Sequence, residues 1–205
     1  MEICLIRHGE TVYNIEDRMQ GVREIELSPK GIDEAKALGT LLKRENILPG
    51  KIFSSPVKRA IDTARYMNLE VEVVPNSAFR ARSLGDLEGL TKTEIRSRFP
   101  GALKNLLLWD WLPPGGDETL RDMFRRANTE IESLWKSEES FQMLGIVTHS
   151  GVLEALIRGW LSLSPEDSLP FLLKNAGGAV FFKSKTGWEV KKDFATGDRS
   201  FEDFS

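Results

Sequence analysis

The stretch that decides the fold is residues 1–11, MEICLIRHGET. An unbroken apolar run at residues 3–6 ends abruptly in the basic pair Arg7 and His8, followed by Gly9. Such a run predicts a buried strand whose C-terminal end opens into a loop. In open α/β sheets these strand ends are where ligands bind. We therefore expect a ligand site directly after residue 7.

The second of only two histidines lies in the same kind of place. His149 follows the apolar run 143–147, just as His8 follows the run 3–6. Because the carboxyl ends of parallel strands meet at one edge of a sheet, we expect the two imidazoles to share a site.

Strand and helix patterns alternate along most of the remaining chain. Apolar residues at near-helical spacing, with polar residues at the expected helix starts, predict helices at 29–44, 57–67, 91–98, 119–137, from 150 onward and, briefly, from 164. Further strands are predicted at 51–54, 71–74, 179–182 and 188–190. The fold class is therefore α/β, a three-layer sandwich with a mostly parallel, mixed sheet of about six strands and helices on both faces.

The length and composition favour one domain. A chain of 205 residues with 40% hydrophobic residues can bury one sizeable core. Periodicity weakens over 75–118, which contains Trp109 and Trp111, and this segment is predicted to be a lid inserted over the sheet edge. The tail, 195–205, is polar and is expected to be mobile.

Charge and cysteine content restrict the partners and the compartment. With 28 basic against 31 acidic residues, no long-range field favours nucleic acid or a membrane surface. The single cysteine, Cys4, excludes a disulfide framework, and no signal-peptide or membrane-span pattern is present, so the cytoplasm is the expected location.

Four side chains at the predicted strand-to-helix junctions suggest one chemistry. If Arg7, His8, Arg59 and His149 meet, two imidazoles and two guanidiniums surround one point. Guanidinium forks match phosphate oxygens, and the helix start at Ser150 and Gly151 adds amides that favour an anion. The implied ligand is a phosphoryl group.

Several sequence blocks resemble, in order, those of the histidine phosphatase superfamily, the clan of cofactor-dependent phosphoglycerate mutases. The blocks are LIRHGETVYN at 5–14; Gln20, Gly21, Leu27 and Gly31; SSP with Arg59, Ala60, Thr63 and Ala64 at 54–64; GDLEGLT at 85–91; and THSG at 148–151. The match spans about residues 3 to 151, and it is specific because the blocks occur together in the family's order.

The resemblance implies a role for each matching residue. His8 is the nucleophile that becomes phosphohistidine, Arg7 and Arg59 hold the phosphoryl oxygens, and His149 donates to the same group. Asn14 matches a position that also bonds the phosphoryl group. No metal or other cofactor is expected, since two displacements through a covalent intermediate need none.

Further residues are assigned to substrate binding. These are Gly21, Ser150, Gly151, Glu118, Arg80 and Arg82. Arg80 and Arg82 are more often a solvated face, but as a hypothesis they hold a second anionic group of the substrate. Glu118 with Thr119 resembles the family's G-E-S block with one extra residue, Asp117.

One position departs from the family. Its usual glutamate, four residues before the glycine of G-D-x-E-G, protonates the leaving alkoxide, and here that position is Ala81. Either another acid substitutes, or turnover is slow, or the alanine replaces the natural acid. The nearby candidates are Asp86, Glu88, Asp117 and Glu118.

The sequence thus predicts a phosphomonoesterase that hydrolyses a small phosphorylated metabolite and releases inorganic phosphate. Two alternatives stay open. One is a phosphoglycerate-type mutase, in which the phosphoryl group returns to the substrate. The other is a phosphoryl-binding or regulatory protein whose catalysis is weakened at Ala81.

Overall fold

The first strand, β1 (Glu2–Arg7), lies inside the sheet, as its apolar run predicts. The protein is described from a computed structural model, which covers residues 2–138 and 140–196. β1 pairs in parallel with β4 (Met143–Thr148), and Arg7 lies opposite Thr148. The two histidines therefore follow neighbouring strands at the same edge of the sheet, where the sequence places them.

The sheet has six strands in the order β3-β2-β4-β1-β5-β6. The strands β2 (Lys51–Ser54) and β3 (Val73–Pro75) are parallel to β4 and to each other. The last two, β5 (Gly177–Lys183) and β6 (Trp188–Ala195), form an antiparallel hairpin beside β1. The predicted mixed, mostly parallel sheet is confirmed.

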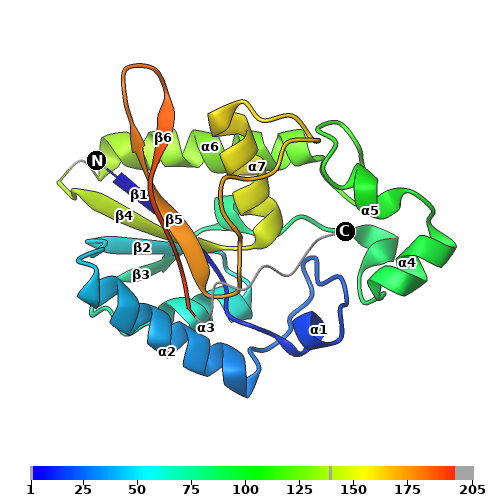
Figure 1. The fold of residues 1–205 in the computed structure, drawn as a ribbon, viewed down its shortest axis with the longest axis horizontal. Coiled ribbons are helices and arrows are strands. Elements are labelled where there is room, and N and C mark those ends of the chain that lie inside the picture. Colours follow the sequence, from blue (N-terminus) through cyan, green and yellow to red (C-terminus); the bar gives the residue numbers. More distant parts are fainter. Residues whose placement is uncertain (1, 139, 197–205) are drawn as a thin grey trace.

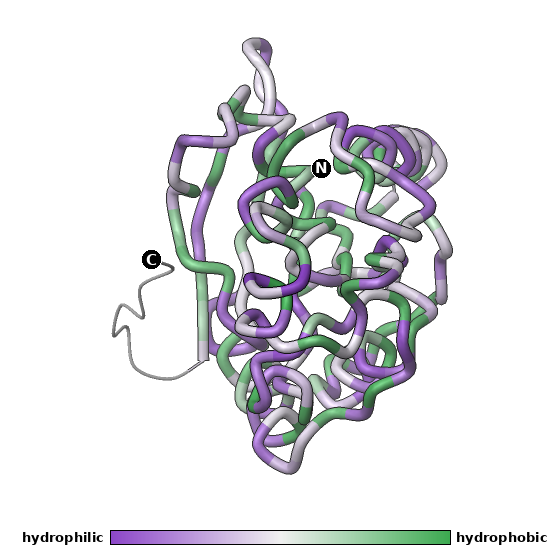
Figure 2. Tube along the Cα trace, turned by 90° about the vertical axis from the view of Figure 1, so that its right-hand side faces the viewer, coloured by the Kyte–Doolittle hydropathy of each residue, from purple (hydrophilic) through white to green (hydrophobic). Residues whose placement is uncertain are grey.

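Helices cover both faces of the sheet (Figure 1). On one side lie α2 (Pro29–Arg44) and α3 (Lys58–Tyr66), and on the other α6 (Leu120–Ser137) and α7 (Ser150–Leu161). Successive side chains of a strand point to opposite faces, so Cys4 and Ile6 pack toward α2 and α3 while Ile3 and Leu5 pack toward α6 and α7. Figure 2 shows the hydrophobic stretches gathered between these layers and hydrophilic stretches at the periphery.

Side-chain caps set the predicted helix starts. The Ser28 hydroxyl accepts the amide of Gly31 at the start of α2, where Pro29 occupies the first turn. Thr119 and Asp122 form the predicted capping box of α6.

The segment 75–118 carries its own short elements. They are η1 (Ser77–Phe79), η2 (Gly85–Leu87), α4 (Lys92–Arg98) and α5 (Ala102–Asn105). A separate apolar cluster of Leu84, Leu87, Ile95 and Ala102 holds η2, α4 and α5 together, whereas Phe79 of η1 packs into the main core. Figure 1 places α4 and α5 beside the sheet rather than on either of its faces. A further one-turn helix that the sequence did not predict, α1 (Val12–Ile15), follows β1.

Several predicted boundaries are wrong. No helix begins at Ser164, because the Asp167 carboxylate accepts the Ser164 amide and buried Arg158 binds the carbonyls of both residues, which closes a turn instead. α3 begins at Lys58, not at residue 57, and β5 and β6 are longer than predicted. Of the predicted tail, Ala195 belongs to β6, and 197–205 lie outside the described residues.

Within the described ranges, no helix is both long and apolar enough to cross a membrane.

Candidate active site

The two histidine rings lie side by side at the carboxyl edge of β1 and β4. The ring centroids of His8 and His149 are 5.3 Å apart, and both side chains are buried. The two residues are far apart in sequence, but the parallel register of β1 and β4 brings them together.

The His8 imidazole is held in one orientation by its own backbone. Its Nδ1 lies 2.8 Å from the carbonyl oxygen of Gly9. A carbonyl only accepts, so Nδ1 carries the proton and Nε2 keeps the lone pair. The Gly9 amide donates to the hydroxyl of Thr63 at 3.0 Å. A neutral imidazole with a free Nε2 is a competent nucleophile.

Glycine is needed at position 9 because another backbone approaches closely. A Cβ there would lie 2.5 Å from the carbonyl oxygen of Gly31, and a Cβ at Gly31 would lie 2.0 Å from that of Glu10. The loop after His8 therefore packs directly against the start of α2. This contact explains why both glycines occur in the sequence blocks.

His149 is held at both ring nitrogens. Its Nδ1 lies 3.1 Å from an Nη2 of Arg59, and its Nε2 lies 2.7 Å from the Ser55 hydroxyl. Because the guanidinium only donates, Nδ1 accepts from it and Nε2 donates to Ser55. Ser55 does not cap α3, which begins at Lys58 and has no side-chain cap.

Arg59 is buried in the first turn of α3, and two backbone carbonyls fix its guanidinium. Nη1 donates to Arg23 at 2.8 Å, and Nη2 donates to Gly21 at 2.8 Å. Gly21, predicted to bind substrate, thus contacts Arg59 through its carbonyl oxygen. Arg7 is fixed similarly, since its Nη1 donates to the carbonyl of Leu173 at 2.6 Å. The Nε atoms of Arg7 and Arg59 are buried without a partner among the described residues.

The electrostatic environment keeps both imidazoles neutral. Burial, followed by the charges of Arg59 and Arg7, holds the pKa of His8 well below its usual 6.5. The pKa of His149 is lowered by burial and then by Arg59, with Arg126 among the smaller causes. Burial also lowers the pKa values of Arg7 and Arg59 to about 10, so both guanidiniums are still charged at neutral pH.

Asn14 lies beside His8 and takes part in a hydrogen-bond cluster. Its Oδ1 accepts from the amide and the hydroxyl of Thr11 and from Nδ2 of Asn175 at 3.1 Å. The same Nδ2 of Asn175 lies 3.3 Å from the carbonyl oxygen of His8.

Ala81 is buried, with 7% of its surface exposed, and two of the proposed substitute acids, Glu88 and Glu118, are held by other groups. The Glu88 carboxylate accepts the amides of Leu84 and Val22. It thereby joins the G-D-L-E-G turn to the loop whose carbonyls hold Arg59. This arrangement favours the loop-orienting interpretation of Glu88.

Glu118 is clamped by two arginines. Arg126 donates to it twice, at 2.9 and 2.7 Å, and Arg80 lies 3.4 Å away. Arg126 also donates to the carbonyls of Ala78 and Arg80, so Glu118 and Arg126 together hold the backbone of residues 78–80 in place. Asp86 and Asp117 are exposed. Neither aspartate is among the groups that shift the pKa of His8 or His149.

The two arginines beside Ala81 lie in different environments. Arg80 pairs with Glu118 and Asp117 at the surface. Arg82 is only 6% exposed, and its Nη2 donates to the carbonyl of Leu106, whereas its Nη1 is buried without a partner among the described residues. Burial lowers the pKa of Arg82, and Glu118 partly opposes this shift. The expectation of solvation is wrong for Arg82, because its side chain packs inside the segment 75–118, against the backbone of Leu106.

Ser150 and Gly151 form the first turn of α7, as predicted, and both are exposed. His149 is the residue that precedes this helix, and its side chain makes no cap bond, so it is directed into the site.

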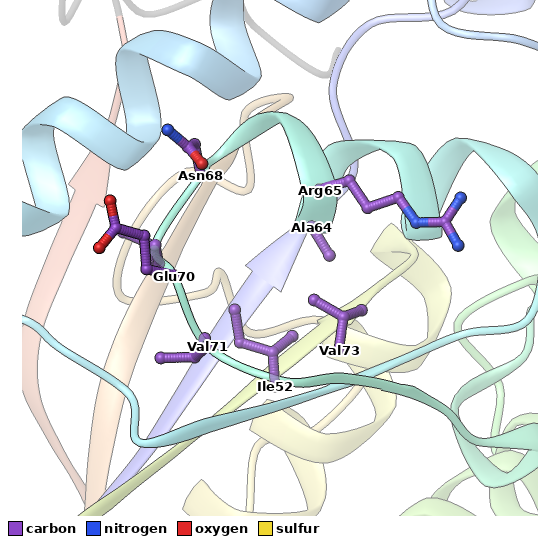
Figure 3. A pocket seen from close by; sticks show the side chains of 8 residues that line it. Ile52, Ala64, Arg65, Asn68, Glu70, Val71 and Val73 are labelled. Carbon is purple, nitrogen blue, oxygen red and sulfur yellow. The ribbon is translucent and has the colours of Figure 1, made fainter.

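A cavity of about 220 Å³ lies between α3 and the strands β2 and β3 (Figure 3). It is lined by Ile52, Ala64, Arg65, Asn68, Leu69, Glu70, Val71 and Val73. None of the predicted site residues lines this cavity. No group of three or more His, Cys, Asp or Glu side chains in the described part of the chain is placed to hold a metal ion.

Sequence reasoning missed three contributors, which are Asn175, Ser55 as a partner of His149, and Arg126. Asn175 lies in a segment without periodicity, where no signal singles it out. Arg126 lies in α6, directly before the buried Ala127. A basic residue next to the buried face of a helix is a weak indication that it binds a carboxylate of the same chain.

Comparisons with known proteins agree with this geometry. A sequence model of the histidine phosphatase superfamily (branch 1) matches residues 3–194. Glucosyl-3-phosphoglycerate phosphatase of Mycobacterium tuberculosis is 33% identical over 206 residues, covering 94% of this chain and 88% of the relative. Metal-independent phosphoserine phosphatase of Arabidopsis thaliana is 33% identical over 189 residues, covering 90% and 77%.

A mutase is comparably similar. The 2,3-bisphosphoglycerate-dependent phosphoglycerate mutase of Xanthobacter autotrophicus is 32% identical over 191 residues, covering 88% of this chain and 90% of the relative. Among solved structures, the mycobacterial glucosyl-3-phosphoglycerate phosphatase in complex with VO3 has a TM-score of 0.80 at 30% identity, covering 93% and 96%. With the family model matching almost the whole chain, the protein belongs to the histidine phosphatase superfamily, branch 1.

Proposed function

We propose that the chain is a metal-independent phosphomonoesterase that hydrolyses a small phosphorylated metabolite in the cytoplasm through a phosphohistidine at His8. The observation that carries the proposal is the neutral His8 imidazole, with Nδ1 bound to Gly9 and Nε2 free, buried beside two charged guanidiniums. Buried positive charge next to a neutral nucleophile favours attack on a dianionic phosphoryl group.

The reaction follows as two displacements. Nε2 of His8 attacks phosphorus, the P–O bond to the leaving group breaks, and the departing oxygen takes a proton. Water then attacks the phosphohistidine, the P–N bond breaks, and inorganic phosphate leaves. Arg7 and Arg59 bind the phosphoryl oxygens, Asn14 and the amides of Ser150 and Gly151 donate to them, and His149 stabilises the charge that develops on them.

The substrate is proposed to carry a second anionic group. Two relatives are named for glucosyl-3-phosphoglycerate and phosphoserine, which are small phosphate esters that also bear a carboxylate. In this chain the buried Nη1 of Arg82 has no partner among the described residues, whereas Arg80 is already paired. We therefore assign the second anion to Arg82, while Glu118 orders the lid.

The second candidate is mutase activity, which the likeness to the Xanthobacter autotrophicus mutase favours. It differs only in the acceptor of the phosphoryl group. A bisphosphate that primes isomerisation with no release of free phosphate would identify a mutase.

The first prediction concerns the intermediate. The reaction must be quenched with base, because phosphohistidine is hydrolysed in acid and is stable in base. Brief incubation with a labelled aryl phosphate, followed by rapid quenching and mapping under alkaline conditions, should therefore place the label on His8. His8→Ala should take up none, and His149→Ala should still be labelled at His8, but more slowly. Steady turnover of the substrate with no label on His8 would refute the phosphohistidine.

The second prediction concerns the leaving group. With Ala81 in the acid position, an aryl phosphate, whose leaving group needs little protonation, should turn over faster than an alkyl phosphate. Ala81→Glu should accelerate only the alkyl substrate, by about 10²-fold or more, the usual contribution of general acid catalysis. Equal rates on both substrates in the parent protein would mean that another residue supplies the proton. Tight phosphate binding without turnover of either substrate would indicate a binding protein.

The third prediction concerns Arg82. Arg82→Met should lower kcat/KM for a phosphorylated carboxylic acid about 10- to 100-fold relative to phenyl phosphate, because a hydrogen bond to a charged group is worth about 1.5–3 kcal/mol. Arg80→Met is the matched control and should change this ratio little. An unchanged ratio in Arg82→Met would remove the second anion site.

The fourth prediction concerns pH and stability. The unfolded His8 takes up a proton near its usual pKa of 6.5, whereas the folded one does not until a much lower pH. The unfolded state thus binds more protons below that pKa, so the free energy of unfolding falls as the pH falls. Urea unfolding between about pH 7 and about pH 5.5 should show a loss approaching about 1.4 kcal/mol per pH unit for each neutral buried imidazole. His8→Gln should have a smaller slope, and parallel curves would refute the depressed pKa.

A further inference from the structure

The segment 173–176, between α7 and β5, is called the strap here, and three of its residues contact the site. The Leu173 carbonyl accepts Nη1 of Arg7, and the Ala176 amide donates to the carbonyl of His8 at 3.2 Å. Between them, Asn175 reaches both His8 and Asn14. The strap therefore contacts Arg7, His8 and Asn14.

The strap has a fixed conformation at this point. Ala176 is fully buried and has a φ of 46°, in the left-handed region that residues other than glycine seldom adopt. Such a conformation persists where the surroundings determine it, and it accumulates at functional sites. The Ala176 amide also donates to the carbonyl of His8, which fixes the backbone at this point. The preceding residue, Asn175, is thereby held in place.

The contacts of Asn14 define which way its side-chain amide points. Three donors converge on Oδ1, namely the amide and the hydroxyl of Thr11, at 3.1 and 3.0 Å, and Nδ2 of Asn175 at 3.1 Å. An amide NH₂ group in the place of that oxygen would face three donors, so the opposite orientation is disfavoured. The NH₂ group of Asn14 is consequently directed away from Thr11 and Asn175.

We propose that Asn175 is a positioning residue that fixes the Asn14 amide with its NH₂ group toward the phosphoryl oxygens and holds the His8 carbonyl in place. The inference rests on the proposed function for the identity of the phosphoryl ligand. It adds a residue from the loop before β5, whereas His8 and His149 follow the parallel strands β1 and β4.

Binding of inorganic phosphate, measured by titration calorimetry, tests the assignment. Asn175→Ala should weaken phosphate binding about 3- to 10-fold, the loss expected for one neutral hydrogen bond. Asn175→Asp should weaken it more, because a carboxylate repels Oδ1 of Asn14 and accepts its NH₂ group instead. Leu172→Asp, at an exposed neighbouring position, carries the same charge and should bind phosphate almost as the parent does.

A double-mutant cycle separates positioning from a general structural role. If Asn175 acts through Asn14, then Asn175→Ala should have little further effect in an Asn14→Ala background. Equal losses in both backgrounds, or unchanged binding in Asn175→Ala, would overturn the proposal. A loss with Leu172→Asp as large as that with Asn175→Asp would attribute the aspartate effect to charge alone and count against the proposal.

The side-chain ¹⁵N signal of Asn14 gives a readout without ligand. It should shift in both Asn175 variants and not in Leu172→Asp, and an unchanged signal would overturn the proposal. If this signal responds but no phosphohistidine forms, the proposed function fails while the positioning role of Asn175 stands. The isosteric Asn175→Asp keeps the measurement possible if Asn175→Ala does not fold.

Discussion

The site depends on holding two guanidiniums, buried and charged, beside two neutral imidazoles. Moving a charged group out of water is unfavourable, so Arg7 and Arg59 are tolerated only because backbone carbonyls satisfy part of their hydrogen-bonding capacity. Burial, reinforced by these charges, lowers the pKa of His8 and keeps its imidazole unprotonated. Under the proposed function, one arrangement thus prepares the nucleophile and attracts a phosphoryl dianion.

Those carbonyls come from loops that the parallel strands do not themselves position. Gly21 and Arg23 belong to the loop before α2, and Leu173 to the strap before β5. The Glu88 carboxylate accepts an amide of the first loop, at Val22, and one of its own turn, at Leu84. Backbone carbonyls of these loops therefore determine where the two guanidiniums lie.

The segment 75–118 surrounds Ala81, the position at which this chain departs from its family. Around Ala81, the pair of Glu118 and Arg126 anchors the backbone, while Arg82 is folded inward and Arg80 stays at the surface. A buried arginine with an unused donor is suited to an anionic substituent, whereas an alanine at the acid position gives no proton to an alkoxide. Under the proposed function, Arg7 and Arg59 serve the phosphoryl group, and the efficiency of cleavage depends on how readily the leaving group departs without a proton.

Local sequence determined the strands that end at His8 and His149, the caps of α2 and α6, and the fold class, because periodicity and capping depend on neighbours within a few residues. The family blocks also singled out the residues that converge there. Only the tertiary structure decided the burial of Arg82, the partners of Arg59 and the contacts of Asn175, which lies 161 residues from Asn14. Such contacts arise from the packing of distant loops, and no local pattern encodes them.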